Sequence, residues 1–233
     1  MKPTLLITRP AGLGEATAEA AERAGFAALV APLLVVGPVP FQPPVARPEA
    51  LVFTSPQAPA LARHPDLPRD VPAWTVGART AAAARAAGFS VAGEGRSDAR
   101  ALLAEMVAAG VQSALHLRGE DVAPLEVPPG LRLDARTVYR ARALDRLPPA
   151  AETALRAGAC DAVLLFSPRT AAIFACLADR AGLARPGIAL VAISARAADA
   201  AGQGWRAVVQ ADAPSQGAML RAACALLRTP LCG

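Results

Sequence analysis

Short apolar runs alternate along the chain with longer segments in which apolar and polar residues recur at helical spacing. Each apolar run stops at turn-forming residues, which is typical of a strand buried on both faces of a parallel sheet. The pattern predicts strands at residues 4–8, 27–31, 33–38, 50–54, 73–76, 89–92, 114–117, 132–135, 162–166, 188–193 and 206–209. It predicts helices at residues 12–24, 57–63, 78–87, 97–109, 121–126, 149–158, 169–180, 195–201 and 215–228, the second of them shortened by Pro59. Because strands alternate with helices, right-handed crossovers and parallel sheets are expected, and the fold class is α/β.

Two distant stretches of the chain resemble each other. An apolar run ends at Ser55-Pro56 and another at Ser167-Pro168, and an Ala-rich helical segment follows each. The likeness continues downstream, where Gly77 corresponds to Ser194 and Ser97 to Ser215, with offsets of 112, 117 and 118 residues in order. Chance similarity between Ala-rich stretches is one explanation. The constant order and spacing favour the other, which is two similar halves that face one cleft.

The strand count suggests how these halves are built. Residues 50–135 hold five predicted strands, enough for a small parallel sheet, whereas residues 162–209 hold three. The two strands at the start of the chain would supply the missing pair. The prediction is a discontinuous domain of residues 1–34 and 143–233, with a second domain of residues 40–135 inserted into it. The chain crosses at residues 35–39 and 136–142, which can pair as a short antiparallel ribbon, and such a connection lets the cleft open and close.

The composition of the chain limits the cellular compartment and the kinds of metal or cofactor site that we expect. Hydrophobic residues make up 54% of the chain, but no run of 18 apolar residues occurs, so no membrane contact is expected. The first apolar run is too short for a signal peptide, and we expect a cytoplasmic protein. Cys160, Cys176, Cys224 and Cys232 lack metal-binding spacing, so the first three are expected to be buried apolar residues and no metal site is predicted. Gly12, Gly14 and Thr17 form an incomplete dinucleotide fingerprint, so no cofactor is expected.

The positive charge of the chain comes almost entirely from arginine. The net charge is +5, and Lys2 is the only lysine among 24 basic residues. An arginine side chain can grip a carboxylate with two hydrogen bonds, although a codon bias would produce the same composition. A lysine-based phosphate loop and an interior Schiff-base lysine are excluded. The arginines are scattered with little aromatic interleaving, which argues against nucleic acid as a partner.

Several motifs, in this order, resemble those of the uroporphyrinogen-III synthase family. They are Thr8-Arg9-Pro10, Phe53-Thr54-Ser55-Pro56, Val76-Gly77-Ala78-Arg79-Thr80-Ala81, Leu117-Arg118-Gly119-Glu120, Val138-Tyr139-Arg140, Phe166-Ser167-Pro168 and Ala213-Pro214-Ser215. Each motif alone is weak, but their order and spacing are specific, and together they span almost the whole chain.

The resemblance implies two flavodoxin-like domains, joined by a two-stranded ladder, with a cleft between them. It implies a cofactor-free, cyclising hydro-lyase of haem biosynthesis that acts on hydroxymethylbilane, a linear tetrapyrrole. Such an enzyme expels the substrate hydroxyl, inverts ring D through a spiro intermediate and closes the macrocycle to uroporphyrinogen III. The substrate carries eight carboxylates, which suits a basic, Arg-rich protein. We expect a monomer whose partner is this small molecule.

The resemblance also implies the site residues. Tyr139, the only tyrosine, would lie on the ribbon and donate a proton to the departing hydroxyl, since the tyrosine of this motif is the usual candidate for that role in the family. The alternative is that Tyr139 only caps the ribbon. Arg118 would hold a carboxylate, or else be a solvated or structural arginine. The expected substrate-binding residues are Arg9, Thr54, Ser55, Gly77, Thr80, Arg118, Gly119, Ser167 and Ser194. Four of these, Thr54, Ser55, Thr80 and Ser167, are also expected to be helix caps.

One turn departs from the family pattern. The family usually has Gly-x-x-Thr where this chain has Ser194-Ala195-Arg196-Ala197. This change favours a second hypothesis, in which the chain is a non-catalytic binding or regulatory module that recognises a polyanionic small molecule. Resolving the type I and type III products formed from hydroxymethylbilane would separate the two hypotheses.

Overall fold

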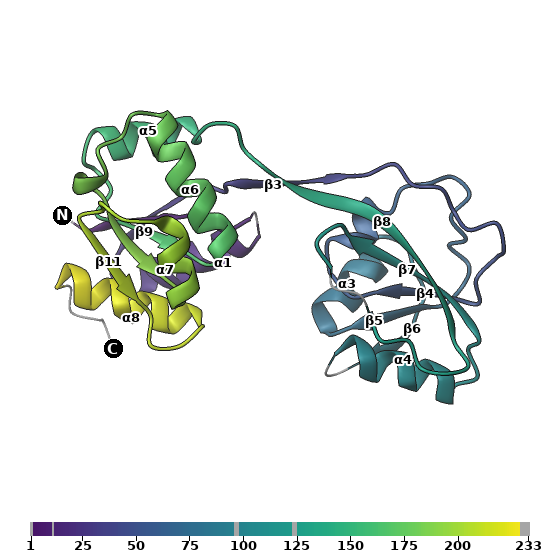
Figure 1. Cartoon of the computed structure of the whole chain (residues 1–233). Helices are drawn as coiled ribbons and strands as arrows, with labels where there is room; N and C mark the ends of the chain where they lie inside the picture. The colour runs from purple at the N-terminus through teal and green to yellow at the C-terminus, as the bar shows by residue number, and fades with distance from the viewer. Residues whose placement is uncertain (1, 11, 96–97, 123–124, 229–233) are drawn as a thin grey trace. The chain divides into compact units, whose positions relative to one another are not determined.

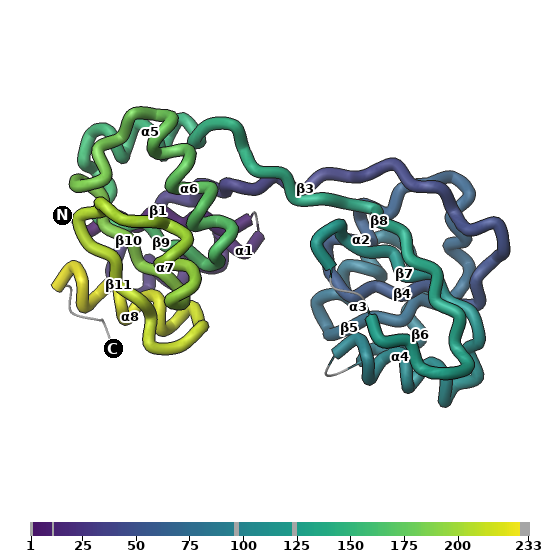
Figure 2. Tube along the Cα trace, viewed as in Figure 1, coloured from purple at the N-terminus to yellow at the C-terminus, as the bar shows by residue number. Residues whose placement is uncertain are grey.

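The computed structural model describes residues 2–10, 12–95, 98–122 and 125–228 (Figure 1). The chain forms two compact units, one of Met1–Val35 with Ala143–Gly233 and one of Val36–Arg142. Each unit is built on its own sheet, and the trace in Figure 2 shows that segments from both ends of the chain contribute to the first unit.

The first unit contains a five-stranded parallel sheet. Its strands are β1 (Thr4–Ile7), β2 (Ala27–Val30), β9 (Ala162–Leu165), β10 (Ala189–Ala192) and β11 (Ala207–Gln210). Their order is β11-β10-β9-β1-β2 and every pair is parallel, which is the 2-1-3-4-5 order of flavodoxin-like sheets. Strands β1 and β2 thus complete the sheet that β9, β10 and β11 begin, in agreement with the strand count.

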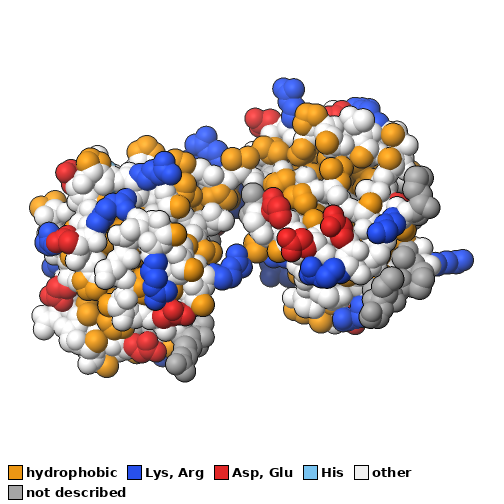
Figure 3. Space-filling view, turned by 180° about the vertical axis from the view of Figure 1, so that it is seen from behind, with side chains coloured by type: hydrophobic (Ala, Val, Ile, Leu, Met, Phe, Trp, Pro, Cys, Tyr) orange, Lys and Arg blue, Asp and Glu red, His pale blue; other side chains and the backbone are white. Residues whose placement is uncertain are grey.

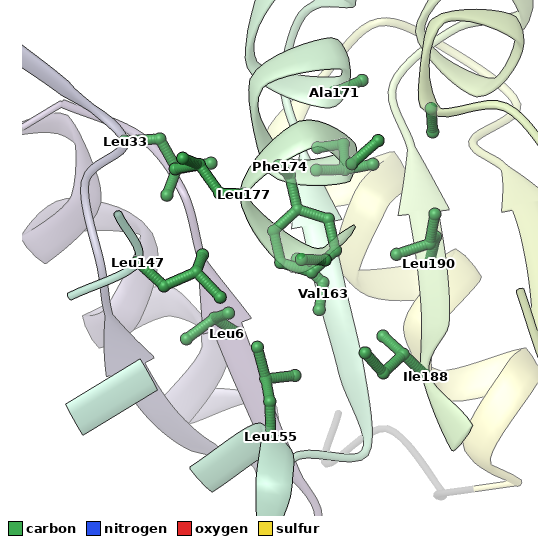
Figure 4. Packing of buried hydrophobic residues seen from close by; sticks show 14 of the residues in the cluster. Leu6, Leu33, Leu147, Leu155, Val163, Ala171, Phe174, Leu177, Ile188 and Leu190 are labelled. Carbon is green, nitrogen blue, oxygen red and sulfur yellow. The ribbon is translucent and has the colours of Figure 1, made fainter. Parts of the chain in front are cut away.

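Helices cover both faces of this sheet. They are α1 (Leu13–Arg23), α5 (Pro149–Arg156), α6 (Pro168–Arg180), α7 (Ala195–Ala201) and α8 (Gln216–Leu227), with a short 3₁₀ helix η1 (Arg185–Gly187). Alternate residues of β1 point to opposite faces, so Leu6 packs with α5, α6 and α7, whereas Leu5 and Ile7 pack with α1 and α8. Figure 4 shows the first of these layers, in which Phe174 of α6 lies next to Val163 of β9.

The second unit contains most of a six-stranded sheet. Its strands are β3 (Leu34–Pro38), β4 (Ala50–Phe53), β5 (Ala73–Val76), β6 (Val91–Gly95), β7 (Ser113–Gly119) and β8 (Arg132–Ala143), in the order β3-β8-β7-β4-β5-β6. Among the five strands from β4 to β8, every neighbouring pair is parallel. The helices α2 (Ala58–Leu61) and α3 (Ala78–Ala86) pack on one face, and α4 (Ala99–Ala108) packs on the other. The fold class predicted from the sequence is therefore confirmed.

Strands β3 and β8 carry the chain across the boundary between the units. The amide of Leu144 donates to the Leu33 carbonyl, and the amide of Val39 donates to the Val138 carbonyl. As the residue number rises on one side it falls on the other, so the two segments run antiparallel. The strands predicted separately at 132–135 and 136–142 are one strand of 12 residues, because the half-exposed alternation of the second continues the ladder of the first.

Some local predictions were wrong. Residues 121–126 are not helical where the structure describes them, and residues 123 and 124 lie outside the described residues. Cys176 is exposed, because it lies on the outward face of α6, whereas Cys160 and Cys224 are buried as predicted. Ser97 and Cys232 lie outside the described residues.

The face of the molecule drawn in Figure 3 carries no single concentrated patch of charge. Figure 3 shows Lys and Arg side chains dispersed over one face of the molecule, among acidic and apolar ones. Among the described helices, none combines the length and the apolar character needed to cross a bilayer.

Candidate functional site

Each sheet has one point where the strand order reverses, and several of the predicted site residues lie near these points, whereas Gly77, Thr80 and Ser194 follow other strands. In the first unit the reversal lies between β1 and β9, and in the second it lies between β4 and β7. Open α/β sheets bind ligands beyond the carboxyl ends of the strands at such points. Arg9 and Ser167 follow β1 and β9, while Ser55 and Arg118 lie at the ends of β4 and β7.

In the second unit, Tyr139 contacts the turn that follows β4. Its hydroxyl donates a hydrogen bond to Ser55 Oγ, at 2.9 Å. The contact depends on a β-bulge, because Arg118 pairs with Thr137 but Gly119 pairs with Tyr139. The extra residue, Val138, is fully buried in the core, and the shift in register turns Tyr139 towards Ser55.

Gly119 leaves room for the Tyr139 ring. A Cβ atom added at Gly119 would lie 2.6 Å from Tyr139 Cζ and 2.8 Å from its hydroxyl oxygen, closer than real side chains allow. The phenol therefore lies directly over the backbone of residue 119. The absence of a side chain at Gly119 makes this close approach possible.

Only some of the hydrogen-bond donors of the Arg118 side chain have a partner within the described residues. One of its terminal nitrogens, Nη1, donates to the carbonyl of Val122 at 3.0 Å. Its Nε atom is buried and finds no hydrogen-bond partner among the residues that the structure describes. A buried donor of this kind costs free energy unless a ligand or water accepts from it. On the neighbouring strand, the Nε atom of Arg140 is in the same condition, although an Arg140 terminal nitrogen lies 3.7 Å from Glu120.

Thr54 contacts a residue that the sequence predictions did not include. Its hydroxyl lies 3.0 Å from Nε2 of His116, which is 1% exposed on β7. Burial of the ring, and the nearby charge of Arg118, lower the pKa of His116 to about 4. The ring is therefore neutral at physiological pH. Thr54 is not a helix cap, because α2 begins after Gln57.

Gly77 and Thr80 are placed differently from the expectation. Gly77 precedes α3 at a φ of 77°, a conformation that favours glycine, and its amide already donates to the Gly95 carbonyl. Thr80 lies inside the first turn of α3 and is 3% exposed. It is therefore not the cap of α3, and its side chain packs in the interior. Gly77 contributes the shape of the turn, and the hydroxyl of Thr80 is covered.

In the first unit, Arg9 is held by residues from both ends of the chain. Its Nη1 atom lies 3.2 Å from Thr17 Oγ1 and 3.5 Å from Gln216 Oε1. Its guanidinium group stacks on the Phe166 ring, with 4.6 Å between Cζ and the ring centroid. These contacts hold Arg9 at the carboxyl end of β1. Thr17 and Gln216 were not predicted, although Thr17 belongs to the glycine-containing turn already noted.

Ser167 and Ser194 cap the helices that follow β9 and β10. Ser167 Oγ accepts from the Thr170 amide at 3.1 Å, and Ser194 Oγ accepts from the Ala197 amide at 3.3 Å. The cap predicted at Ser167 is confirmed. Ser55 behaves as a turn residue, since its Oγ accepts from the Gln57 amide at 3.3 Å. Within the described part of the chain, no group of three or more His, Cys, Asp or Glu residues is arranged to hold a metal ion.

Comparison with known families shows to which protein family the chain belongs. The family profile described as uroporphyrinogen-III synthase HemD matches residues 15–221. The chain belongs to the uroporphyrinogen-III synthase family. This confirms the resemblance drawn from the motifs and places the chain among the enzymes of haem biosynthesis.

A solved structure with this name shares the fold. The uroporphyrinogen-III synthetase of Helicobacter pylori 26695 is 18% identical with a TM-score of 0.58, and the match covers 97% of this chain and 100% of that one. The uroporphyrinogen III synthase of Thermus thermophilus is also 18% identical, with a TM-score of 0.44 and coverage of 97% and 100%. A comparison with curated protein sequences gives no match.

Proposed function

We propose that this chain converts hydroxymethylbilane to uroporphyrinogen III, with loss of water, inversion of ring D and closure of the macrocycle. The observation that carries the proposal lies at the β4–β7 reversal, where the Tyr139 hydroxyl is hydrogen-bonded to Ser55 after β4 and Arg118 lies near the end of β7. This end of the sheet offers a phenolic proton donor and a cationic side chain with an unused buried donor. These are the two groups that a substrate with a leaving hydroxyl and several carboxylates requires.

In the proposed reaction, Arg118 holds a substrate carboxylate and Tyr139 assists the departing hydroxyl. Electrons from the pyrrole nitrogen expel the hydroxyl, which takes up a proton from the phenol and leaves as water. The azafulvene cation that remains is attacked by the substituted α-carbon of ring D, which gives the spiro intermediate. The bond from that carbon to the methylene bridge of ring C then breaks, and the released methylene carbon bonds to the free α-carbon of ring D. The proton that ring D loses on this closure returns to the Tyr139 phenolate. Ser55 holds the Tyr139 hydroxyl in place before the substrate arrives. Most of the catalytic effect is expected from holding and folding the substrate, rather than from a strong acid or base.

In the first unit, Arg9, Ser167 and Ser194 form the second set of substrate contacts in this proposal. Arg9 is a cation held in a fixed orientation by Thr17, Gln216 and Phe166. Helices α6 and α7 follow β9 and β10, the next two strands after β1 in the sheet. The N-terminal end of a helix carries partial positive charge. Both features suit carboxylates of the substrate.

The deciding experiment supplies hydroxymethylbilane and separates the type I and type III isomers of the product. We expect the type III isomer in excess of the type I isomer that forms spontaneously. If only type I product forms, the enzyme hypothesis fails and the alternative remains, a non-catalytic module for a polyanionic small molecule. The altered turn at Ser194–Ala197 is the observation that favours this alternative.

Replacing Arg118 tests how the substrate is held. Arg118→Ala should weaken substrate binding by about 1.5–3 kcal/mol, the usual loss for one hydrogen bond to a charged group, while turnover changes less. The measurement is KM and kcat on the same preparation. An unchanged KM would remove Arg118 from the site.

A further inference from the structure

Among the residues that the structure describes, His116 is the buried titratable residue next to the proposed site to which the reaction assigns no role. It lies on β7, where it pairs with Val52 of β4 and is 1% exposed. Thr54 follows Val52 by two residues, so it points to the same face of the sheet. The Thr54 hydroxyl and His116 Nε2 are 3.0 Å apart as a result.

The position of His116 would suit an apolar side chain better if packing were its only role. Its neighbours Leu115 and Leu117 are fully buried, and so is Val52. A polar ring placed among apolar residues costs free energy unless its nitrogens are hydrogen-bonded. In the described structure, the side-chain contact that His116 makes with a polar group is the one to Thr54.

The neutral state of the ring matters for this contact. A neutral imidazole has one nitrogen that donates and one that accepts, whereas a charged ring only donates. Burial keeps the pKa of His116 near 4, and the charge of Arg118 acts in the same direction. His116 therefore keeps one protonation state across the physiological range, and it holds Thr54 without introducing a second cation beside Arg118.

We propose that His116 is a positioning residue, whose ring fixes the hydroxyl of Thr54 at the end of β4 so that it contacts a substrate carboxylate beside Ser55 and Tyr139. This inference rests on the proposed function and deepens it. Ser55 and Thr54 are consecutive, and each is held by a partner from a neighbouring segment, Tyr139 for Ser55 and His116 for Thr54. The turn after β4 thus presents two oriented hydroxyl groups rather than one.

The test is a double-mutant cycle with hydroxymethylbilane as the substrate and type III product as the readout. His116→Phe replaces the ring by an apolar one of similar size, and Thr54→Val removes the hydroxyl at nearly constant shape. We expect each single variant to raise KM roughly tenfold with a smaller change in kcat, since one oriented hydrogen bond is lost in both. If His116 acts through Thr54, the double variant should show little further loss.

Two controls keep the result interpretable. His64→Phe changes the only other histidine, which lies next to Phe41 and away from the reversal point, and it should keep wild-type kinetics. If His116→Phe does not fold, His116→Asn serves as the second variant, with thermal unfolding measured for every protein. The inference would be overturned if the two effects on KM multiply in the double variant, or if His116→Phe keeps the wild-type KM. In either case the proposed function still stands if the wild-type protein forms type III product. Absence of type III product from the wild type would overturn both.

Discussion

Tyr139 can be separated from its surroundings by removing a single oxygen. Tyr139→Phe deletes the hydrogen bond to Ser55 but keeps the ring over Gly119. If the phenol assists hydroxyl departure, turnover should fall by roughly 10²-fold or more, with folding intact. Initial rates and melting temperature measured on one preparation provide the test. Wild-type turnover would leave Tyr139 only the role of a packing residue on the ladder.

His116 gives the protein a predictable acid sensitivity. Its pKa is about 4 in the folded protein and about 6.5 when unfolded, so the unfolded state takes up a proton first as the pH falls. Stability contributed by the neutral ring is complete above pH 6.5 and is lost as the pH falls towards 4. From these values, wild type should lose about 2.5 kcal/mol more than His116→Phe between pH 7.5 and pH 4.5.

Urea unfolding of both proteins at the two pH values measures this difference. The acidic groups contribute equally to both proteins, so subtracting the two pH dependences isolates His116. The charge nearest the ring is that of Arg118, which should be left unchanged. Equal pH dependence in the two proteins would show that the ring is not buried in its neutral form.

Single residues were the hardest features to predict from the sequence. The motif residues near the reversal points were expected from a family resemblance, and the turn that follows each buried strand is visible in the hydrophobic pattern. His116 was missed because a lone histidine in a strand gives no local sign of its partner, which is 62 residues away. The partners of Arg9 were missed for the same reason, since Thr17 and Gln216 are separated by 199 residues.

At the scale of elements, a residue that caps a helix can both stabilise the fold and contact the substrate. Ser167 begins α6, and its Oγ accepts from the Thr170 amide. Ser167→Ala should lower the free energy of unfolding by about 1 kcal/mol, within the usual range for a lost cap. Ser167→Asp keeps a cap at that position but adds a negative charge, so it should retain stability and raise the KM for a polycarboxylate substrate.

Asp98→Ala is the matched control for this pair of variants. Asp98 caps α4 through the Ala101 amide, and α4 follows the edge strand β6 rather than a reversal point. It should lose a similar amount of stability, measured by urea unfolding, and keep wild-type kinetics. An unchanged KM in Ser167→Asp would place Ser167 outside the substrate contacts and leave it a cap alone.

The positions of strands and helices could be predicted from the sequence, whereas the register in which the strands pair could not. Buried strands such as β4 and β10 are continuous apolar runs, and Ser167 and Ser194 mark the N-terminal starts of α6 and α7. The bulge at Gly119 could not be predicted, because a register shift depends on the partner strand and leaves no local pattern. The same bulge decides where Tyr139 points, so the geometry around Tyr139 could not be predicted, and the membership of the site stays a prediction.

At the scale of the whole molecule, the two units should fold as separate domains. A fragment of residues 36–142 contains the parallel strands β4 to β8 with three helices and their own core. We predict that this fragment unfolds cooperatively in urea, with far-ultraviolet circular dichroism typical of an α/β protein. A fragment of residues 1–142 should show the same transition with no second one, because β1 and β2 then lack β9. A fragment of 36–142 that does not fold would show that the two units depend on each other.

The position of β1 has a consequence for the protein during its synthesis. In the finished sheet β1 lies between β2 and β9, yet more than a hundred residues separate it from β9, since Leu5 pairs with Ala162. Strand β1 is translated long before β9, so it must wait before it can pair on both sides. All of the second unit is translated in the meantime, so nascent chains should carry one folded unit and an incomplete β1-α1-β2 segment whose apolar β1 edge is uncovered. That exposed segment is where a chaperone would be needed until β9 has been translated.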